Sequence, residues 1–241
     1  MYGWRARLGV MIPSVNSVIE PEFAHLSSLT PGVSSYFSRM IMKGQSKFEQ
    51  LESMVESIDE CVESLLDVSD VLLYGCTSGS FLKGPAWDNT ITEHIKSVAI
   101  GKEVITTSNA LVQALRELMV QTIVLATPYI EEVNEKQVSY FRKSGFTVAS
   151  VLGLSITTRG GAGLCTPDEA YRLARKVAQG QSADAIVISC TNFRTLGAIN
   201  LLENDLGIPV VTSNQALFWA GLRRTGISSP IYGYGSLLES S

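Results

Sequence analysis

The chain has 241 residues, enough for one large domain or two half-size ones, and enough to bury a sizeable core. Its 19 lysines and arginines stand against 23 aspartates and glutamates, a formal net charge of −4 without a basic stripe, so we expect neither nucleic acid nor an anionic membrane surface as a partner. No apolar stretch approaches the roughly 20 residues of a membrane span, and the N-terminus lacks the long apolar core of a signal peptide.

Cysteine and histidine usage limits the chemistry further. Four cysteines, at positions 61, 76, 165 and 190, are too widely spaced for a disulfide framework, and the chain has only two histidines. We therefore expect no metal site and no organic cofactor, in a reduced, cytoplasmic protein. We also expect a homo-oligomer, either a dimer or a tetramer.

Short apolar runs bounded by turn residues predict strands that are buried on both faces. In chain order these runs are 8–12, 71–75, 104–107, 122–126, 146–152, 185–189 and 210–212, and 34–42 is a weaker strand candidate. Helical patterns lie between them over 47–67, 89–100, 110–119, 130–144, 195–206 and 216–223, and a further helix starts after Thr166, which is followed by proline and, at the third position, glutamate. Strands that alternate with helices in this way predict parallel sheets built from βαβ units.

Three segments recur in the same order in the two halves of the chain. They are LGVMIP and IVLATP, Cys76-Thr77 and Cys190-Thr191, and VITTSNAL and VVTSNQAL. The repeat predicts two pseudo-symmetric α/β lobes, each a short parallel sheet flanked by helices, with the active site in the cleft between them. We place the lobes at 1–112 and 113–215, with 216–241 packing back on the first lobe.

Cys76 and Cys190 each follow a buried-strand pattern, at the end of the strand where open α/β sheets place ligands. If the two lobes pair about an approximate two-fold axis, the cysteines flank one small site from opposite sides. The small polar residues after each cysteine predict an anion-binding environment that also favours the thiolate. Two such thiols can exchange protons with a substrate, or one can attack while the other delivers a proton. Cys61 and Cys165 are expected to be ordinary packing residues.

Two other readings remain open from the residues alone. One is a pair of buried cysteines without chemistry, and the other is a non-catalytic two-lobed protein that closes on a carboxylate. The glycine-rich segment Arg159–Gly163 lacks the lysine and hydroxyl residue of a P-loop, so we expect 153–163 to be a loop, either a lid or a plain connection.

The chain resembles the aspartate/glutamate racemase superfamily, and within it the maleate cis-trans isomerase and arylmalonate decarboxylase group. The segments that carry this resemblance span the chain: Pro13–Asn16 with Glu20, Cys76–Ser80, Ala126–Tyr129, Ser189–Asn192 with Arg194, and Thr212–Ala216. The resemblance implies two pseudo-symmetric α/β lobes, a small carboxylate substrate held between them, and no cofactor.

Within the group, isomerases keep both cysteines, whereas the decarboxylases have glycine at the position of Cys76. The resemblance therefore implies a maleate-type isomerase in which Cys76 adds to the double bond of a small enedioate and Cys190 donates or accepts a proton. The substrate-binding residues expected on this basis are Asn16, Thr77, Ser78, Tyr129, Thr191 and Asn192, with Ser14, Thr127 and Arg159 as further candidates. An amino-acid racemase with two acid/base thiols and an arylmalonate-type decarboxylase remain the enzymatic alternatives.

One departure from the group concerns the second substrate carboxylate. Maleate isomerases have an asparagine after the strand that corresponds to 146–152, but this chain reads Ser-Ile-Thr-Thr-Arg over 155–159. Arg159 is the candidate for that contact if the glycine-rich segment closes as a lid, and the alternative is a solvated arginine on a loose loop.

Overall fold

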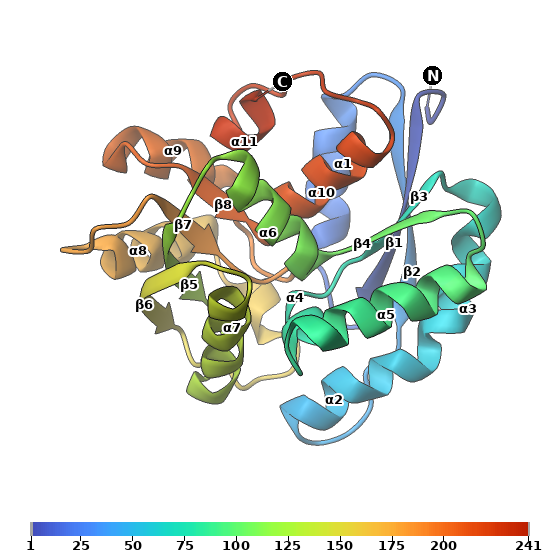
Figure 1. Ribbon diagram of the computed structural model, residues 1–241, viewed down its shortest axis with the longest axis horizontal. Helices are drawn as coiled ribbons and strands as arrows, with labels where there is room; N and C mark the ends of the chain where they lie inside the picture. The colour runs from blue at the N-terminus through green and yellow to red at the C-terminus, as the bar shows by residue number, and fades with distance from the viewer. Residues whose placement is uncertain (1, 241) are drawn as a thin grey trace.

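Two four-stranded parallel sheets form the frame of the molecule (Figure 1). The computed structural model describes residues 2–240. The first sheet consists of β1 (Ala6–Pro13), β2 (Val33–Met40), β3 (Val71–Tyr74) and β4 (Glu103–Thr106), and the second of β5 (Thr122–Thr127), β6 (Thr147–Gly153), β7 (Ala185–Ile188) and β8 (Val210–Thr212). Their orders, β2-β1-β3-β4 and β6-β5-β7-β8, are equivalent, which confirms the predicted α/β fold with two pseudo-symmetric halves.

The central strands β3 and β7 are buried along their whole length. All four residues of β3 and all four of β7 are buried, whereas the edge strand β6 is only partly so. Strands that are covered on both faces need apolar side chains on both faces, which explains the continuous apolar runs in the sequence. Because β3 and β7 are equivalent strands, Cys76 and Cys190 follow equivalent strand ends.

Helices follow the strands in the alternation that the sequence predicts. They are α1 (Ile19–Ser28), α2 (Lys47–Ser53), α3 (Ile58–Leu65), α4 (Thr77–Phe81), α5 (Pro85–Val98), α6 (Thr107–Glu117), α7 (Glu131–Lys143), α8 (Pro167–Ala178), α9 (Leu196–Leu206), α10 (Ser213–Arg224) and α11 (Ser236–Glu239). The N-terminus of α8 has the capping box predicted from its sequence, in which Thr166 and Glu169 bond each other's backbone N–H groups. Within residues 2–240, we find no helix with the length and apolar character needed to cross a membrane.

The prediction of one continuous helix over 47–67 is wrong. The segment forms α2, a 3₁₀ turn, α3 and a second 3₁₀ turn. Two serines explain the break, because their side chains bond backbone groups of the preceding connection: Ser53 Oγ accepts the N–H of Lys43, and Ser57 Oγ accepts the N–H of Ile41. Such side-chain bonds compete with regular helix geometry.

Three helices, α1, α4 and the four-residue α11, have no clear signal in the sequence. Pro21 interrupts the pattern of α1, although it lies in the first turn, where proline is tolerated. The five residues of α4 are too few to show a helical period. This short helix matters for the site, because it begins directly after Cys76.

The last long helix crosses between the two halves. Although α10 follows β8 of the second sheet, it packs against α6 and contacts β3 and β4 of the first sheet. The two helices lie side by side in the middle of the molecule (Figure 1). The largest apolar cluster accordingly includes residues of both sheets, so the halves share one core. The lobe limits of 1–112 and 113–215 stay a prediction.

Candidate active site

A cavity of about 270 Å³ lies between the carboxyl ends of the two sheets. Both halves contribute to its wall, through Pro13, Val15, Asn16, Met42, Gln45, Leu51, Cys76, Thr77, Ser78, Pro128, Tyr129, Ile130, Val133, Ile156, Thr157, Thr158, Gly160, Gly161, Ala162, Cys190, Thr191 and Asn192. None of these side chains is a lysine, arginine, histidine, aspartate or glutamate. Among residues 2–240 there is also no group of three or more metal-ligating side chains that could hold an ion. An anion in this cavity would therefore be held by neutral hydrogen-bond donors.

Cys76 occupies the N-cap position of α4. Its Sγ accepts a hydrogen bond from the backbone N–H of Gly79 at 3.3 Å and lies 3.9 Å from the hydroxyl of Ser78. The side chain is almost fully buried, yet it lines the cavity. A donor aimed at the sulfur stabilises negative charge there, as a nucleophilic thiolate requires.

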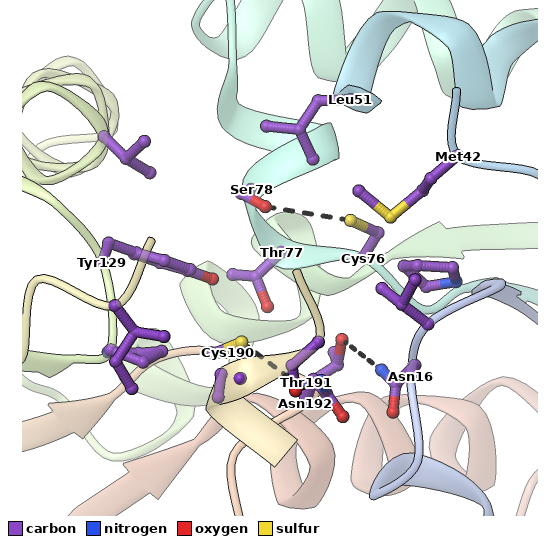
Figure 2. Close-up of a pocket in the computed structure, with 18 of the residues that line it drawn as sticks. Asn16, Met42, Leu51, Cys76, Thr77, Ser78, Tyr129, Cys190, Thr191 and Asn192 are labelled. Atoms are coloured by element: carbon purple, nitrogen blue, oxygen red, sulfur yellow. Dashed lines mark hydrogen bonds between the residues drawn. The ribbon is translucent and has the colours of Figure 1, made fainter. Parts of the chain in front are cut away.

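Cys190 lies on the opposite wall, in the loop after β7 (Figure 2). Its Sγ accepts the N–H of Asn192 at 3.4 Å, and its own N–H donates to Ser213 Oγ at 3.0 Å. The φ angle of Cys190 is 151°, a backbone conformation that residues with a side chain rarely adopt. The structure therefore brings the two cysteines of the sequence repeat to one cavity, each beside a backbone N–H.

Tyr129 lies near both thiols. Figure 2 shows its hydroxyl pointing into the space between Cys190 and Thr77. Burial raises the pKa of Tyr129 well above its ordinary value, and the nearby thiols of Cys190 and Cys76 raise it further. Its hydroxyl is buried and lies beside the side chains of Cys190 and Ser189. A neutral O–H aimed into a cavity is a donor ready for a ligand oxygen.

Three polar residues tie the halves together at the base of the cavity. Asn16 Nδ2 donates to Thr191 Oγ1 at 3.1 Å, and Thr191 Oγ1 donates to the carbonyl of Gly75 at 3.0 Å. Asn192 Oδ1 accepts the N–H of Ser17 at 2.9 Å. The side chain of Thr191 is thus occupied in joining the halves, whereas Asn16 keeps its second amide hydrogen for a ligand.

The three further candidates lie outside the cavity wall. Ser14 Oγ accepts the N–H of Met42, and Thr127 Oγ1 donates to Asn134. Arg159 Nη2 donates to the carbonyl of Met42 at 2.8 Å. In the segment that departs from the maleate isomerase pattern, Ile156, Thr157 and Thr158 line the cavity instead.

The segment 153–163 is fastened against both halves. Besides the bond from Arg159, Asn192 Nδ2 donates to the carbonyl of Gly160, and Arg194 bonds the carbonyls of Gly163 and Cys165. A Cβ atom on Gly163 would lie 2.8 Å from Asn192 Oδ1, so only glycine allows this close approach. The loop therefore forms one wall of the cavity.

Cys61 and Cys165 lie away from the cavity wall. Burial raises the pKa of both thiols, and a neighbouring glutamate adds to the effect for each. These thiols are packing residues, in agreement with their expected role.

Two parts of the site were not predicted from the sequence: the apolar side chains of the cavity wall, and Ser213, which bonds the backbone of Cys190. Met42, Leu51 and Ile156 come from segments without catalytic motifs, so nothing in their local sequence marks them. Ser213 bonds the backbone of Cys190 from behind, and it was visible only as part of the repeated Thr-Ser-Asn segments.

The fold and the cavity define a class of protein: a pseudo-symmetric α/β protein with a pair of thiols facing an uncharged, donor-lined cavity between its halves. More specifically, the chain belongs to the arylmalonate decarboxylase family, whose model matches residues 8–238.

Relatives of known name cover almost the whole chain. The maleate isomerase of Nocardia farcinica is 30% identical over 97% of this chain and 95% of its own length. The arylmalonate decarboxylase of Bordetella bronchiseptica is 29% identical over 97% of each chain.

Solved structures agree in fold. A cysteine-to-serine mutant of the Nocardia farcinica maleate cis-trans isomerase with a covalently bound succinylcysteine intermediate has a TM-score of 0.91, with 28% identity over 97% of this chain and 98% of that one. A liganded arylmalonate decarboxylase mutant, in which a glycine is replaced by cysteine and a cysteine by serine, has a TM-score of 0.86 with 27% identity over 98% of this chain and 100% of that one.

Proposed function

We propose that this protein is a cofactor-independent cis-trans isomerase of a small enedioate, of the maleate-to-fumarate type, acting through a cysteine adduct. The observation that carries the proposal is the pair of cysteines on opposite walls of one cavity, each with a backbone N–H directed at its sulfur. The succinylcysteine intermediate in the Nocardia farcinica enzyme supports thiol addition as a reaction of this fold.

In the proposed reaction the Cys76 thiolate adds to one carbon of the double bond. A C–S bond forms, and the π electron pair moves to the neighbouring carbon and into its carboxylate. Cys190 donates its proton to that carbon, which gives the saturated adduct, and the remaining C–C single bond rotates. Cys190 then removes the proton, the double bond forms again in the trans geometry, and the C–S bond breaks to release the Cys76 thiolate.

The charge that develops on the carboxylate needs donors that are already in place. Asn16 has one amide hydrogen available, and Tyr129 has a buried hydroxyl aimed at the cavity. The N–H groups of Thr77 and Ser78 belong to the first turn of α4, where a helix offers no acceptor of its own. We propose these four residues, together with the loop of Thr191 and Asn192, as the substrate-binding set.

The apolar part of the wall favours a second substrate within the same reaction. Met42, Leu51 and Ile156 face the same space as the polar donors, so an alkyl-substituted enedioate would bury its substituent there. We therefore include 2-methylmaleate beside maleate among the proposed substrates.

Proton NMR in heavy water separates the proposed reaction from its alternatives. The protein is incubated with maleate, 2-methylmaleate, aspartate, glutamate and phenylmalonate. We expect the cis enedioates to give trans products. Deuterium at the α-carbon of an amino acid would indicate a racemase, and loss of carbon dioxide from phenylmalonate a decarboxylase. Binding without any turnover would indicate a carboxylate-binding protein.

Two variants test the assigned roles. Cys76→Ala should abolish isomerisation, because the nucleophile is absent. Cys190→Ser should slow turnover and allow intact-mass spectrometry to detect an adduct with the mass of one maleate. An active Cys76→Ala protein would refute the covalent mechanism.

A further inference from the structure

One buried hydroxyl joins the two cysteine loops. Ser213 is the first residue of α10 and is completely buried. Its Oγ accepts the hydroxyl hydrogen of Thr77 at 2.9 Å and the backbone N–H of Cys190 at 3.0 Å. Thr77 follows Cys76 in the first half, whereas Cys190 belongs to the second. A single oxygen atom therefore connects the two cysteine loops directly.

The pseudo-symmetry of the fold shows what is particular to Ser213. The equivalent junction of the first half, between β4 and α6, also braces its own cysteine loop: Thr107 Oγ1 donates to the carbonyl of Tyr74, and Ser108 Oγ donates to that of Thr77. Those contacts stay within the first half. Ser213 braces the loop of its own half through Cys190 and also reaches across to Thr77.

The backbone conformation of Cys190 indicates what the bond to Ser213 does. At a φ of 151° the residue is in a conformation that persists only when its surroundings hold it. The bond to Ser213 fixes the direction of the Cys190 N–H, and with it the direction in which the side chain leaves the backbone. Because two-thiol chemistry needs both sulfurs at near-attack distance from the substrate, misplacement by about 1 Å costs on the order of 10²-fold in rate.

We propose that Ser213 is a positioning residue that sets the placement of Cys190 relative to the Cys76–Thr77 loop. Its effect on turnover rests on the proposed isomerase function. Its effect on the placement of the Cys190 thiol does not, because that placement can be measured without a substrate.

The test compares Ser213→Ala with a matched control, Ser69→Ala. Ser69 is equally buried, and its substitution removes a hydroxyl bond to the carbonyl of Leu65. It precedes β3, at the opposite end of that strand from Cys76, and does not line the cavity. Iodoacetamide labelling followed by peptide mass spectrometry gives the labelling rates of Cys190 and Cys76, and circular dichroism gives the melting temperature. Maleate turnover gives kcat and KM.

For Ser213→Ala we expect Cys190 to be labelled several-fold faster relative to Cys76, because the strained loop relaxes and exposes its half-buried thiol. We expect kcat to fall by about 10²-fold with a much smaller change in KM. The control should lower the melting temperature and leave the labelling ratio and kcat unchanged. An unchanged labelling ratio in a folded Ser213→Ala protein would overturn the proposal.

A double-mutant cycle keeps the proposal testable through Thr77. Thr77→Val removes the bond from the other side, so it should change the labelling of Cys190 across the cavity. Once Ser213 is alanine, the further change Thr77→Val should have little additional effect on that labelling. Fully additive effects would show that Ser213 does not couple the two loops. If labelling changes as expected while maleate is not turned over, the positioning role stands and the isomerase proposal fails.

Discussion

A buried carboxyl group between the halves should make stability depend on pH in an unusual direction. Asp88 of α5 is 2% exposed, and its Oδ2 accepts the hydroxyl of Tyr140 from α7 at 2.8 Å. Burial raises the pKa of Asp88 from 3.8 to about 6, although hydrogen bonds from Thr106 and Tyr140 partly oppose this. A change of this size corresponds to roughly 3 kcal/mol of folding free energy.

The sign follows from which state binds the proton more tightly. Between pH 3.8 and about 6 the folded protein keeps the Asp88 proton while the unfolded chain has lost it. The free energy of unfolding therefore falls as pH rises through this window, and the loss is complete above pH 6. Asparagine does not titrate, so Asp88→Asn removes this contribution. The stability difference between variant and parent should shift by roughly 2.4 kcal/mol in favour of the variant from pH 4 to pH 7, since part of the full change lies below pH 4.

Urea unfolding of both proteins at pH 4, 5, 6 and 7 measures that difference, and the contributions of groups common to both cancel. Asp184→Asn is the matched control. The backbone N–H groups of Thr122 and Gln121 lower the pKa of Asp184, so its titration lies below this window and the corresponding difference should be flat. An equally flat difference for Asp88→Asn would refute the reasoning, whatever the variant's absolute stability.

Three further predictions follow from the site. Iodoacetamide at neutral pH should label Cys61 slowly, because burial raises its pKa, and rapid labelling there would contradict this. Gly79→Ala should impair turnover at least about tenfold, measured as kcat, because its Cβ would lie 3.1 Å from Cys76 Sγ and displace the proposed nucleophile, which tolerates little misplacement. Arg159→Ala should leave kcat/KM for maleate nearly unchanged, because its guanidinium bonds the Met42 carbonyl outside the cavity wall; a loss of about 10²-fold would instead show that it reaches a substrate carboxylate.

Local patterns in the sequence predicted most of the secondary structure and the alternation of strands and helices. A strand covered on both faces needs apolar residues at every position, so apolar runs marked seven of the eight strands. The eighth, β2, gave only a weaker pattern, because it is fully buried only at its two ends. The repeat of Cys76-Thr77 as Cys190-Thr191 indicated that the two halves share one topology. The helix over 47–67 was mispredicted because the competing bonds of Ser53 and Ser57 depend on a distant backbone segment.

The sequence by itself determined the strands, their alternation with helices, and the positions of the two cysteines at equivalent strand ends, because each of these depends on neighbouring residues. Only the tertiary structure decided how the halves meet. Asn16 bonds Thr191 across 175 residues, Ser213 joins both cysteine loops, and Arg159 bonds backbone outside the cavity wall. These contacts depend on how the two sheets and α10 dock, and a docking geometry is set by the shape of whole packed surfaces rather than by any local pattern.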